Sequence, residues 1–176
     1  MQAVKTIAEP ELSGILRVGQ RAFGYLEKNS GKKYLETLSL ACCIGLYARS
    51  ENGIEALSHI DCGGNTGIRA DSQALIFLDY MKHKGMNPYE IIIVRSATAV
   101  PESISKIYNV LESRKCRNIR GIKGGDSIDI LFENGRPYFV ENAEKQKKDW
   151  QTILDMLNRQ GLKCENTGEI IIPENI

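Results

Sequence analysis

The sequence predicts an α+β protein, with a mostly antiparallel sheet or sandwich and helices packed on it. Short apolar segments of strand length recur along the chain, and Asn-Gly turns join two pairs of them, at residues 52–53 and 134–135. Two longer segments, residues 70–84 and the one that begins at Pro101, have the apolar spacing of amphipathic helices. With 176 residues, 42% of them hydrophobic, the chain can bury a sizeable core without disulfides or metals.

The sequence of the N-terminal half predicts a β-hairpin over residues 35–61. Residues 1–10 are expected to be a loose lead-in, and residues 15–25 an irregular edge strand. Residues 35–48 are apolar and small, and they predict one long buried strand. Residues 54–61 predict the strand that returns antiparallel from the Asn-Gly turn.

The remaining strands are shorter. Residues 89–95 are so apolar that they predict a central strand covered on both faces. Further strands are expected at residues 117–123, 127–133, 136–141 and 169–172.

Three helices are expected. The first spans residues 70–84 and ends before Gly85, and the second starts at Pro101. One face of the second helix is expected to carry Ile104, Ile107, Tyr108 and Leu111. The third, residues 143–160, is charged and amphipathic, with Trp150 in its buried stripe. Because no linker separates two units, we expect one domain over residues 1–176, with residues 143–176 as a C-terminal appendage.

Charge and composition exclude several classes of protein. The 23 Lys and Arg against 22 Asp and Glu give a net charge of +1, which argues against an obligate nucleic-acid binder. No apolar run approaches the roughly 18 residues of a membrane span, and residues 1–9 lack the apolar segment of a secretory signal. The five cysteines include no CxxC pattern, which is typical of a reducing compartment. We therefore expect a cytoplasmic protein, with a secreted effector as the alternative.

The two histidines and five cysteines have no zinc-ligand spacing, so neither a metal site nor a cofactor is expected. The predicted hairpin does place the region of Cys42 and Cys43 opposite His59. A thiol and an imidazole on neighbouring strands can form a nucleophile–base pair, in which the imidazole lowers the thiol pKa. A buried thiol beside a core histidine explains the same pattern, and the hairpin geometry leaves both interpretations open.

The segment Thr37-Leu38-Ser39-Leu40-Ala41-Cys42-Cys43 resembles the Thr-Leu-Gly-Leu-Gly-Ser-Cys segment of bacterial chemotaxis receptor deamidases of the CheD type. Gly53 and His59 have the Gly-to-His spacing of the same family, and Val18-Gly19 falls where that family has a Val-Gly strand. The resemblance covers about residues 15–141 and implies a CheD-like fold. It departs after the histidine, where Ile60-Asp61-Cys62 replaces a Met-Leu-Pro-like stretch, so a chemotaxis substrate does not follow.

The hairpin is also similar to eukaryotic N-terminal asparagine amidohydrolases, which have a Cys 17 residues before a His and an Asp two residues after it. Cys42, His59 and Asp61 match that spacing without a gap. Cytotoxic necrotizing factor deamidases share the Cys–His architecture more distantly. All three resemblances imply hydrolysis of a side-chain amide.

The resemblances imply a catalytic set of Cys43 or Cys42 as the nucleophile, His59 as the base and Thr37 as the third group. Ser58 and Asp61 are weaker candidates for orienting His59. The position of Thr37 favours Cys43, whereas the 17-residue spacing favours Cys42. Because side chains alternate along a strand, only one of the two thiols can face His59, and Cys43 is preferred.

The expected function is a cysteine-dependent protein deamidase that converts glutamine or asparagine side-chain amides to acids. Its partner would be a protein substrate that presents such a side chain, with neither nucleic acid nor membrane insertion involved. Two alternatives remain: a non-catalytic adaptor with the same fold, and a cysteine amidohydrolase that acts on small amides. The adaptor predicts a buried, protonated and unreactive cysteine.

Overall fold

A computed structural model describes residues 3–8, 10–62, 69–141 and 169–171 of the chain. The described strands are β1 (Lys5–Ala8), β2 (Ile15–Arg17), β3 (Phe23–Leu26), β4 (Tyr34–Leu40), β5 (Ile44–Ser50), β6 (Glu55–Ile60), β7 (Pro88–Arg95), β8 (Ile119–Lys123), β9 (Ile128–Glu133), β10 (Arg136–Glu141) and β11 (Glu169–Ile171). The helices are α1 (Ala70–His83), α2 (Pro101–Ser113) and the short 3-10 helix η1 (Leu12–Gly14).

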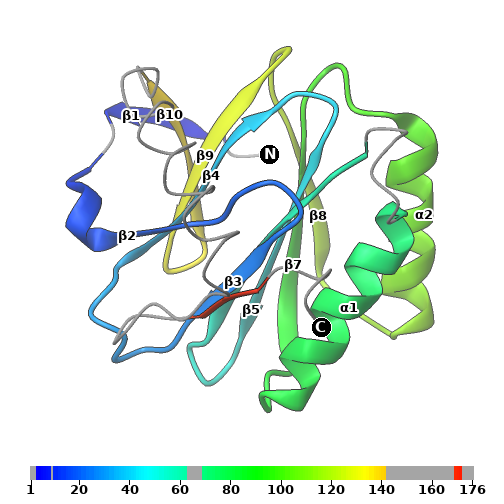
Figure 1. Ribbon diagram of the computed structural model, residues 1–176, viewed down its shortest axis with the longest axis horizontal. Coiled ribbons are helices and arrows are strands. Elements are labelled where there is room, and N and C mark those ends of the chain that lie inside the picture. Colours follow the sequence, from blue (N-terminus) through cyan, green and yellow to red (C-terminus); the bar gives the residue numbers. More distant parts are fainter. Residues whose placement is uncertain (1–2, 9, 63–68, 142–168, 172–176) are drawn as a thin grey trace.

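The strands form two sheets that lie face to face, and α1 and α2 cover the outer face of one of them (Figure 1). The five-stranded sheet has the order β1-β10-β9-β4-β2, and the six-stranded sheet has the order β11-β3-β6-β5-β7-β8. Six of the nine strand pairings between described residues are antiparallel. The predicted α+β class, a mostly antiparallel sandwich with helices packed on it, is confirmed.

An apolar layer lies between the two sheets. At its centre the rings of Tyr47 and Phe132 stack, with centroids 4.1 Å apart. The buried residues around them come from both sheets: Leu35, Leu40, Leu57, Ile92, Val94 and Ile130. This layer joins the sheets into one body and also contains the candidate site.

A second apolar layer lies between the six-stranded sheet and the two helices. Phe77 of α1 meets Phe23 of β3 edge to face, with ring centroids 5.6 Å apart. Further buried side chains of this layer are Leu46, Ile60, Ala74, Met81, Ile91, Ile93, Ile107 and Leu111. As expected for a central strand, residues 91–94 of β7 are buried on both faces.

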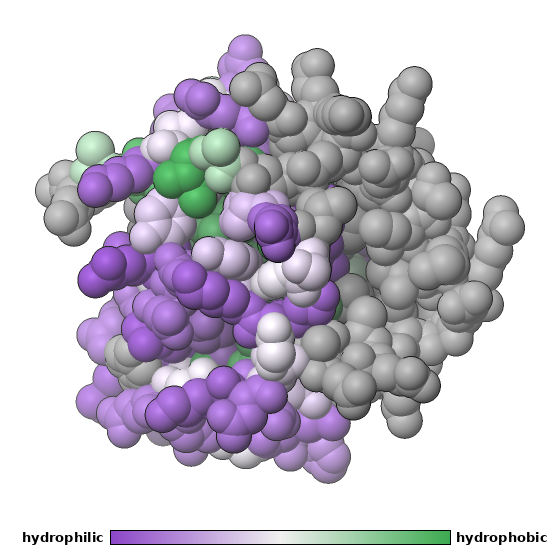
Figure 2. Space-filling view, turned by 90° about the vertical axis from the view of Figure 1, so that its left-hand side faces the viewer, coloured by the Kyte–Doolittle hydropathy of each residue, from purple (hydrophilic) through white to green (hydrophobic). Residues whose placement is uncertain are grey.

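The outer face of the five-stranded sheet carries a smaller apolar cluster of Ile15, Leu38, Leu131 and Val140. Arg17 and Glu36 form a buried ion pair within the same sheet, with Nε 2.6 Å from the carboxylate. Figure 2 shows this side of the molecule, where hydrophilic residues predominate among those described and a small hydrophobic area lies between them.

Both predicted hairpins are present. β5 and β6 pair antiparallel with Gly45 opposite His59, and β9 and β10 pair antiparallel through the second Asn-Gly turn. In that turn Asn134 and Gly135 both have positive φ, of 48° and 78°, which is the conformation that an Asn-Gly pair favours. The two predicted helices at residues 70–84 and from Pro101 are confirmed as α1 and α2, and the closing strand as β11.

The prediction of one long strand over residues 35–48 is wrong. β4 belongs to the five-stranded sheet and β5 to the six-stranded sheet, so the chain crosses between sheets at residues 41–43. The crossing begins at a bulge between Thr37 and Leu40, where Ser39 adopts a positive φ of 58°. Ser96 donates a hydrogen bond to the Ala41 carbonyl and holds the crossing in place. Both halves are apolar and buried, so hydrophobic patterning does not reveal the break.

Three smaller expectations also differ. Residues 15–25 form two strands, β2 and β3, in different sheets, and the lead-in contains β1, which pairs parallel with β10. Tyr108 is 38% exposed, because the buried stripe of α2 is centred on Ile107, Val110 and Leu111.

The predicted helix at residues 143–160, with Trp150, lies outside the described residues, and the single domain with a C-terminal appendage stays a prediction. Within the described ranges, no helix combines the length and apolar character that crossing a membrane requires.

Candidate active site

His59 and Thr37 meet between the two sheets. Nδ1 of His59, on β6, lies 2.8 Å from Oγ1 of Thr37, on β4. The Thr37 hydroxyl donates its one proton to the Val18 carbonyl, at 2.8 Å. Oγ1 must therefore accept from the ring, which places the imidazole proton on Nδ1 and leaves a lone pair on Nε2.

The backbone of His59 is fixed as firmly as its ring. Its carbonyl accepts from the N–H of Arg21 at 2.9 Å, and its N–H donates to the Ala22 carbonyl at 3.0 Å. Arg21 has a positive φ of 61°, which closes a tight turn over residues 19–22 against β6. The turn therefore extends the sheet at the position of His59 and holds residues 20–22 beside it.

Nε2 of His59 is buried and has no hydrogen-bond partner among the described residues. Burial lowers the pKa of His59 to about 4, although the nearby Asp61 carboxylate opposes the shift. The imidazole is therefore neutral near pH 7, and its free nitrogen can accept a proton. An oriented, neutral imidazole with an unpaired lone pair has the properties of a general base.

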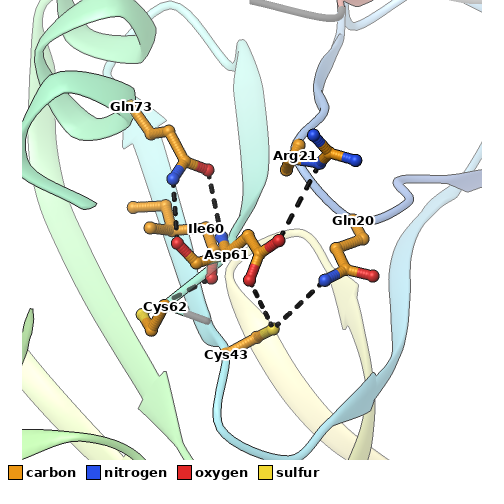
Figure 3. A network of polar contacts seen from close by, with 7 residues as sticks. All are labelled: Gln20, Arg21, Cys43, Ile60, Asp61, Cys62 and Gln73. Carbon is orange, nitrogen blue, oxygen red and sulfur yellow. Dashed lines mark hydrogen bonds and ion pairs between the residues drawn. The ribbon is translucent and has the colours of Figure 1, made fainter. Parts of the chain in front are cut away.

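Cys43 lies just before β5 and its side chain packs in the layer between the sheets, only 5% exposed. Its thiol donates to Oδ1 of Asp61 at 3.9 Å, and the side-chain amide of Gln20 donates to the sulfur at 4.0 Å (Figure 3). The Asp61 carboxylate and the Gln20 amide thus approach the sulfur from two different segments of the chain.

Burial raises the pKa of the Cys43 thiol to about 12, and the charge of Asp61 adds to this, whereas a hydrogen bond from the Cys62 backbone opposes it. This differs from the expectation that His59 lowers the thiol pKa. The physical reason is that the buried imidazole is neutral and offers no positive charge to a thiolate. The resting site thus pairs a neutral thiol with a neutral imidazole.

Asp61 is held in place by helix α1. The side-chain amide of Gln73 accepts from the Asp61 N–H at 3.0 Å and donates to the Asp61 carbonyl at 2.9 Å, so both backbone groups are satisfied (Figure 3). Nε of Arg21 lies 3.8 Å from Oδ2 of the Asp61 carboxylate. Because Asp61 is 3% exposed, these contacts fix the charge beside the sulfur.

The strand register relates Cys43 to His59. His59 pairs with Gly45, and Cys43, two residues before Gly45 and just outside β5, has its side chain in the same layer between the sheets. A Cβ at Gly45 would approach Leu40 to 3.1 Å and Val94 to 3.3 Å, so glycine allows the two sheets to approach closely here.

The sequence-predicted residues are thus placed as follows. Thr37 and His59 are in direct contact, and Cys43 is buried in the same layer. Cys42 is exposed and its side chain lies outside that layer. Asp61, which was expected to orient His59, instead contacts the Cys43 thiol, and Ser58 donates to the Ala22 carbonyl at 3.4 Å.

Sequence reasoning missed Gln20, Arg21 and Gln73. Gln20 and Arg21 directly follow the Val18-Gly19 pair. Gln73 is a polar residue on the buried face of a predicted helix, and this unusual position was a signal in the sequence that could have identified it. In the part of the chain that the structure describes, no group of three or more His, Cys, Asp or Glu side chains is arranged to hold a metal ion.

A scan against protein-family models finds no match for this sequence, and a search of curated proteins finds none either. Among solved structures, the chain is similar to the C-terminal domain of CNFy from Yersinia pseudotuberculosis, with 11% sequence identity and a TM-score of 0.35. The match covers 70% of this chain and 54% of that chain, so this chain spans about half the length of that structure. The chemistry of the site therefore rests on its own residues.

Proposed function

We propose that this protein is a cysteine-dependent deamidase that hydrolyses glutamine or asparagine side-chain amides of a protein substrate. One observation carries the proposal: the Thr37 hydroxyl holds His59 in the tautomer whose free Nε2 can act as a base, in the same buried layer as the Cys43 thiol. A histidine that only filled space in a core would be expected to have both ring nitrogens satisfied.

The reaction starts from neutral groups. In the resting site the thiol donates to Asp61, so it first turns its proton toward Nε2 of His59. As the Cys43 sulfur then attacks the amide carbon of the substrate, Nε2 takes that proton, so no free thiolate has to exist beforehand. This order suits a thiol whose pKa is raised to about 12 and an imidazole whose pKa is lowered to about 4. Thr37 keeps the ring in place by accepting from Nδ1 throughout.

The remaining steps complete the hydrolysis. The imidazolium returns its proton to the departing nitrogen, which leaves as ammonia, and a thioester remains on Cys43. A water molecule then replaces the sulfur, with His59 accepting one of its protons and returning it to the thiol. The net change is amide plus water to carboxylic acid plus ammonia.

Burial and surroundings favour Cys43 over Cys42 as the nucleophile. Cys43 faces the layer that contains His59 and is contacted by Asp61 and Gln20, whereas Cys42 is exposed. The exposure of Cys42 favours the opposite choice, because a protein substrate reaches an exposed thiol more easily, but the Cys42 side chain lies outside the layer that contains His59.

A second candidate function, the non-catalytic adaptor, is favoured by one observation. Cys43 is buried and its pKa is raised, as expected for an inert core thiol. The adaptor does not explain why Nε2 of His59 is buried with no hydrogen-bond partner in the described part of the chain, because an inert core gains nothing from an unsatisfied nitrogen.

The test compares Cys43→Ser with Cys42→Ser on a panel of proteins and peptides rich in glutamine and asparagine. Ammonia release and the small mass gain of an amide that becomes an acid are followed together. We expect Cys43→Ser to abolish both signals and Cys42→Ser to leave them intact. Activity in both variants would contradict the thiol mechanism, and loss in folded Cys42→Ser alone would move the nucleophile to Cys42.

A further inference from the structure

Gln20 makes a polar contact with the candidate nucleophile from the turn between β2 and β3. Gln20 is an exposed residue, yet its Nε2 donates toward the Cys43 sulfur at 4.0 Å. We infer that the side-chain amide of Gln20 is an oxyanion donor for acyl transfer at Cys43, an inference that rests on the deamidase proposed above. In that role it would touch the substrate oxygen and be a catalytic residue.

The backbone at Gln20 is fixed even though the side chain is exposed. Gln20 forms an isolated bridge with His59, and its neighbour Arg21 donates to the His59 carbonyl at 2.9 Å. The turn is closed by the Ala22 N–H, which donates to the Gly19 carbonyl at 3.1 Å. The base and the proposed donor are therefore positioned by the same short segment, as a preorganised site requires.

The charge of Asp61 near the sulfur makes a hydrogen-bond donor there favourable for the reaction. When sulfur adds to an amide carbon, negative charge develops on the substrate oxygen, close to the sulfur. The Asp61 carboxylate lies 3.9 Å from the sulfur and would repel that charge. Gln20 supplies N–H groups beside the same sulfur, and the Cys62 backbone, which also hydrogen-bonds to it, supplies a second donor.

The orientation of the amide distinguishes a donor from a bound substrate mimic. In Figure 3 the nitrogen of Gln20 faces the sulfur while its oxygen points away. Attack on Gln20 itself would need the amide carbon, rather than the nitrogen, to face the sulfur. The observed orientation suits a group that donates to an oxygen bound next to the sulfur.

Two reagents separate this role from simple positioning of the thiol. An activated aryl ester, p-nitrophenyl acetate, acylates the thiol through a tetrahedral oxyanion, forming a thioester and releasing nitrophenol. Iodoacetamide alkylates the same thiol by displacing iodide, with release of a proton and without an oxyanion. The rate of each modification at Cys43 is measured by peptide mass spectrometry on the full chain.

We expect Gln20→Ala to slow acylation of Cys43 by about 10²-fold and to leave alkylation unchanged. Gln20→Glu, nearly the same size but with a carboxylate, is expected to slow acylation at least as much. Asn87→Ala removes an exposed carboxamide just before β7, far along the sheet from Cys43, and is expected to change neither rate.

Three results would overturn the inference. Equal losses of acylation and alkylation would mean that Gln20 only positions the thiol, and unchanged rates would mean a passive surface contact. Conversion of Gln20 to Glu in the incubated wild-type protein would make it a substrate. The proposed function fails separately: if Gln20→Ala slows acylation selectively but no protein amide is hydrolysed, the oxyanion role stands and the deamidase does not.

Discussion

The two interior layers of the protein bury different kinds of side chain. Between the six-stranded sheet and the helices, aromatic and aliphatic groups such as Phe23 and Phe77 fill the space. Between the sheets, the apolar centre around Tyr47 gives way at one end to Thr37 and His59. Nε2 of His59 is buried there with no hydrogen-bond partner among the residues that the structure describes. Such an atom costs about 1–3 kcal/mol, so the layer between the sheets gives up stability at the candidate site. The helix layer thus supplies stability, with Gln73 of α1 also holding Asp61 in place, whereas the layer between the sheets contains the groups of the proposed chemistry.

The largest expected effect lies in the helix layer. Phe77→Ala removes a fully buried ring that packs on Phe23 and should cost about 3–5 kcal/mol of unfolding free energy. Acylation of Cys43 in the folded protein should be unchanged, because the ring does not belong to the layer between the sheets. Urea unfolding and the ester assay measure the two effects. A loss of less than about 1 kcal/mol in unfolding free energy, or a loss of acylation in the folded variant, would show that the two layers do not divide stability and chemistry in this way.

The next effect is a pH dependence that His59 imposes on stability. Its pKa falls from 6.5 to about 4 on folding because of burial, so the unfolded chain binds a proton at a higher pH than the folded protein does. The stability from this neutral histidine is complete above pH 6.5 and is lost as the pH falls toward about 4, by roughly 3 kcal/mol in total. The free energy of unfolding of the wild-type protein, measured by urea at several pH values across this range, should show this loss.

His59→Gln provides the control for this pH dependence, because it retains the exposed His83 and removes only the buried imidazole. In this variant, the free energy of unfolding should not show the fall between pH 6.5 and about 4 that His59 causes in the wild type. Equal slopes in wild type and variant would show that His59 is not desolvated in the folded protein.

Thr37→Val should affect both stability and chemistry. It keeps the shape of the side chain but leaves Nδ1 of His59 without its acceptor, at a cost of about 1–3 kcal/mol. The ring also loses its fixed tautomer, so acylation of Cys43 should fall by about 10²-fold. Thr37→Ser restores the hydroxyl and should recover most of the acylation rate. A folded Thr37→Val protein with the wild-type rate would show that the contact is structural only.

Much of the fold follows from local patterns in the sequence. The Asn-Gly turns identify the hairpins, because the pair favours positive φ values, which both residues adopt at 134–135 and Gly53 adopts in the first turn. Amphipathic spacing with Gly85 and Pro101 as boundary signals identifies α1 and α2. These features depend on neighbours within a few residues and need no knowledge of the other sheet.

The breaks between sheets could not be predicted in the same way. Residues 35–48 are buried on both sides of the crossing at residues 41–43, so hydrophobicity stays high where the chain changes sheet. The position of β1 depends on parallel pairing with the distant β10, while its own residues are largely exposed. Both features are decided by long-range contacts.

The candidate site was predictable only in part. The resemblance identified Thr37, His59 and the two cysteines, and the contact between Thr37 and His59 is present. Asp61 follows His59 by two residues, so the alternation of a strand places both side chains on the same face. Its contact with Cys43, however, depends on how the residues just outside β5 and β6 approach each other, which the sequence does not specify. Gln20 reaches the sulfur from a turn whose course the sequence does not specify.

The smallest expected effect concerns strained backbone near the site. Ser39, at the bulge of β4, is exposed and has a φ of 58°, where glycine avoids the steric cost of a Cβ. Ser39→Gly should therefore stabilise the protein by about 0.5–1 kcal/mol. Asn134→Gly, in the hairpin turn away from the site, should gain less because asparagine tolerates this conformation. Destabilisation by Ser39→Gly in urea unfolding would show that the bulge is not strained.

The central claim is that the Cys43 thiol is the nucleophile and that His59 is its base. The most direct measurement locates the acyl group after reaction of the wild-type protein with p-nitrophenyl acetate, by peptide mass spectrometry across all five cysteines. We expect the earliest label on Cys43, and a rate that falls by about 10²-fold or more in His59→Ala. Earliest label on Cys42 or Cys62, or an undiminished rate at Cys43 in folded His59→Ala, would contradict the account.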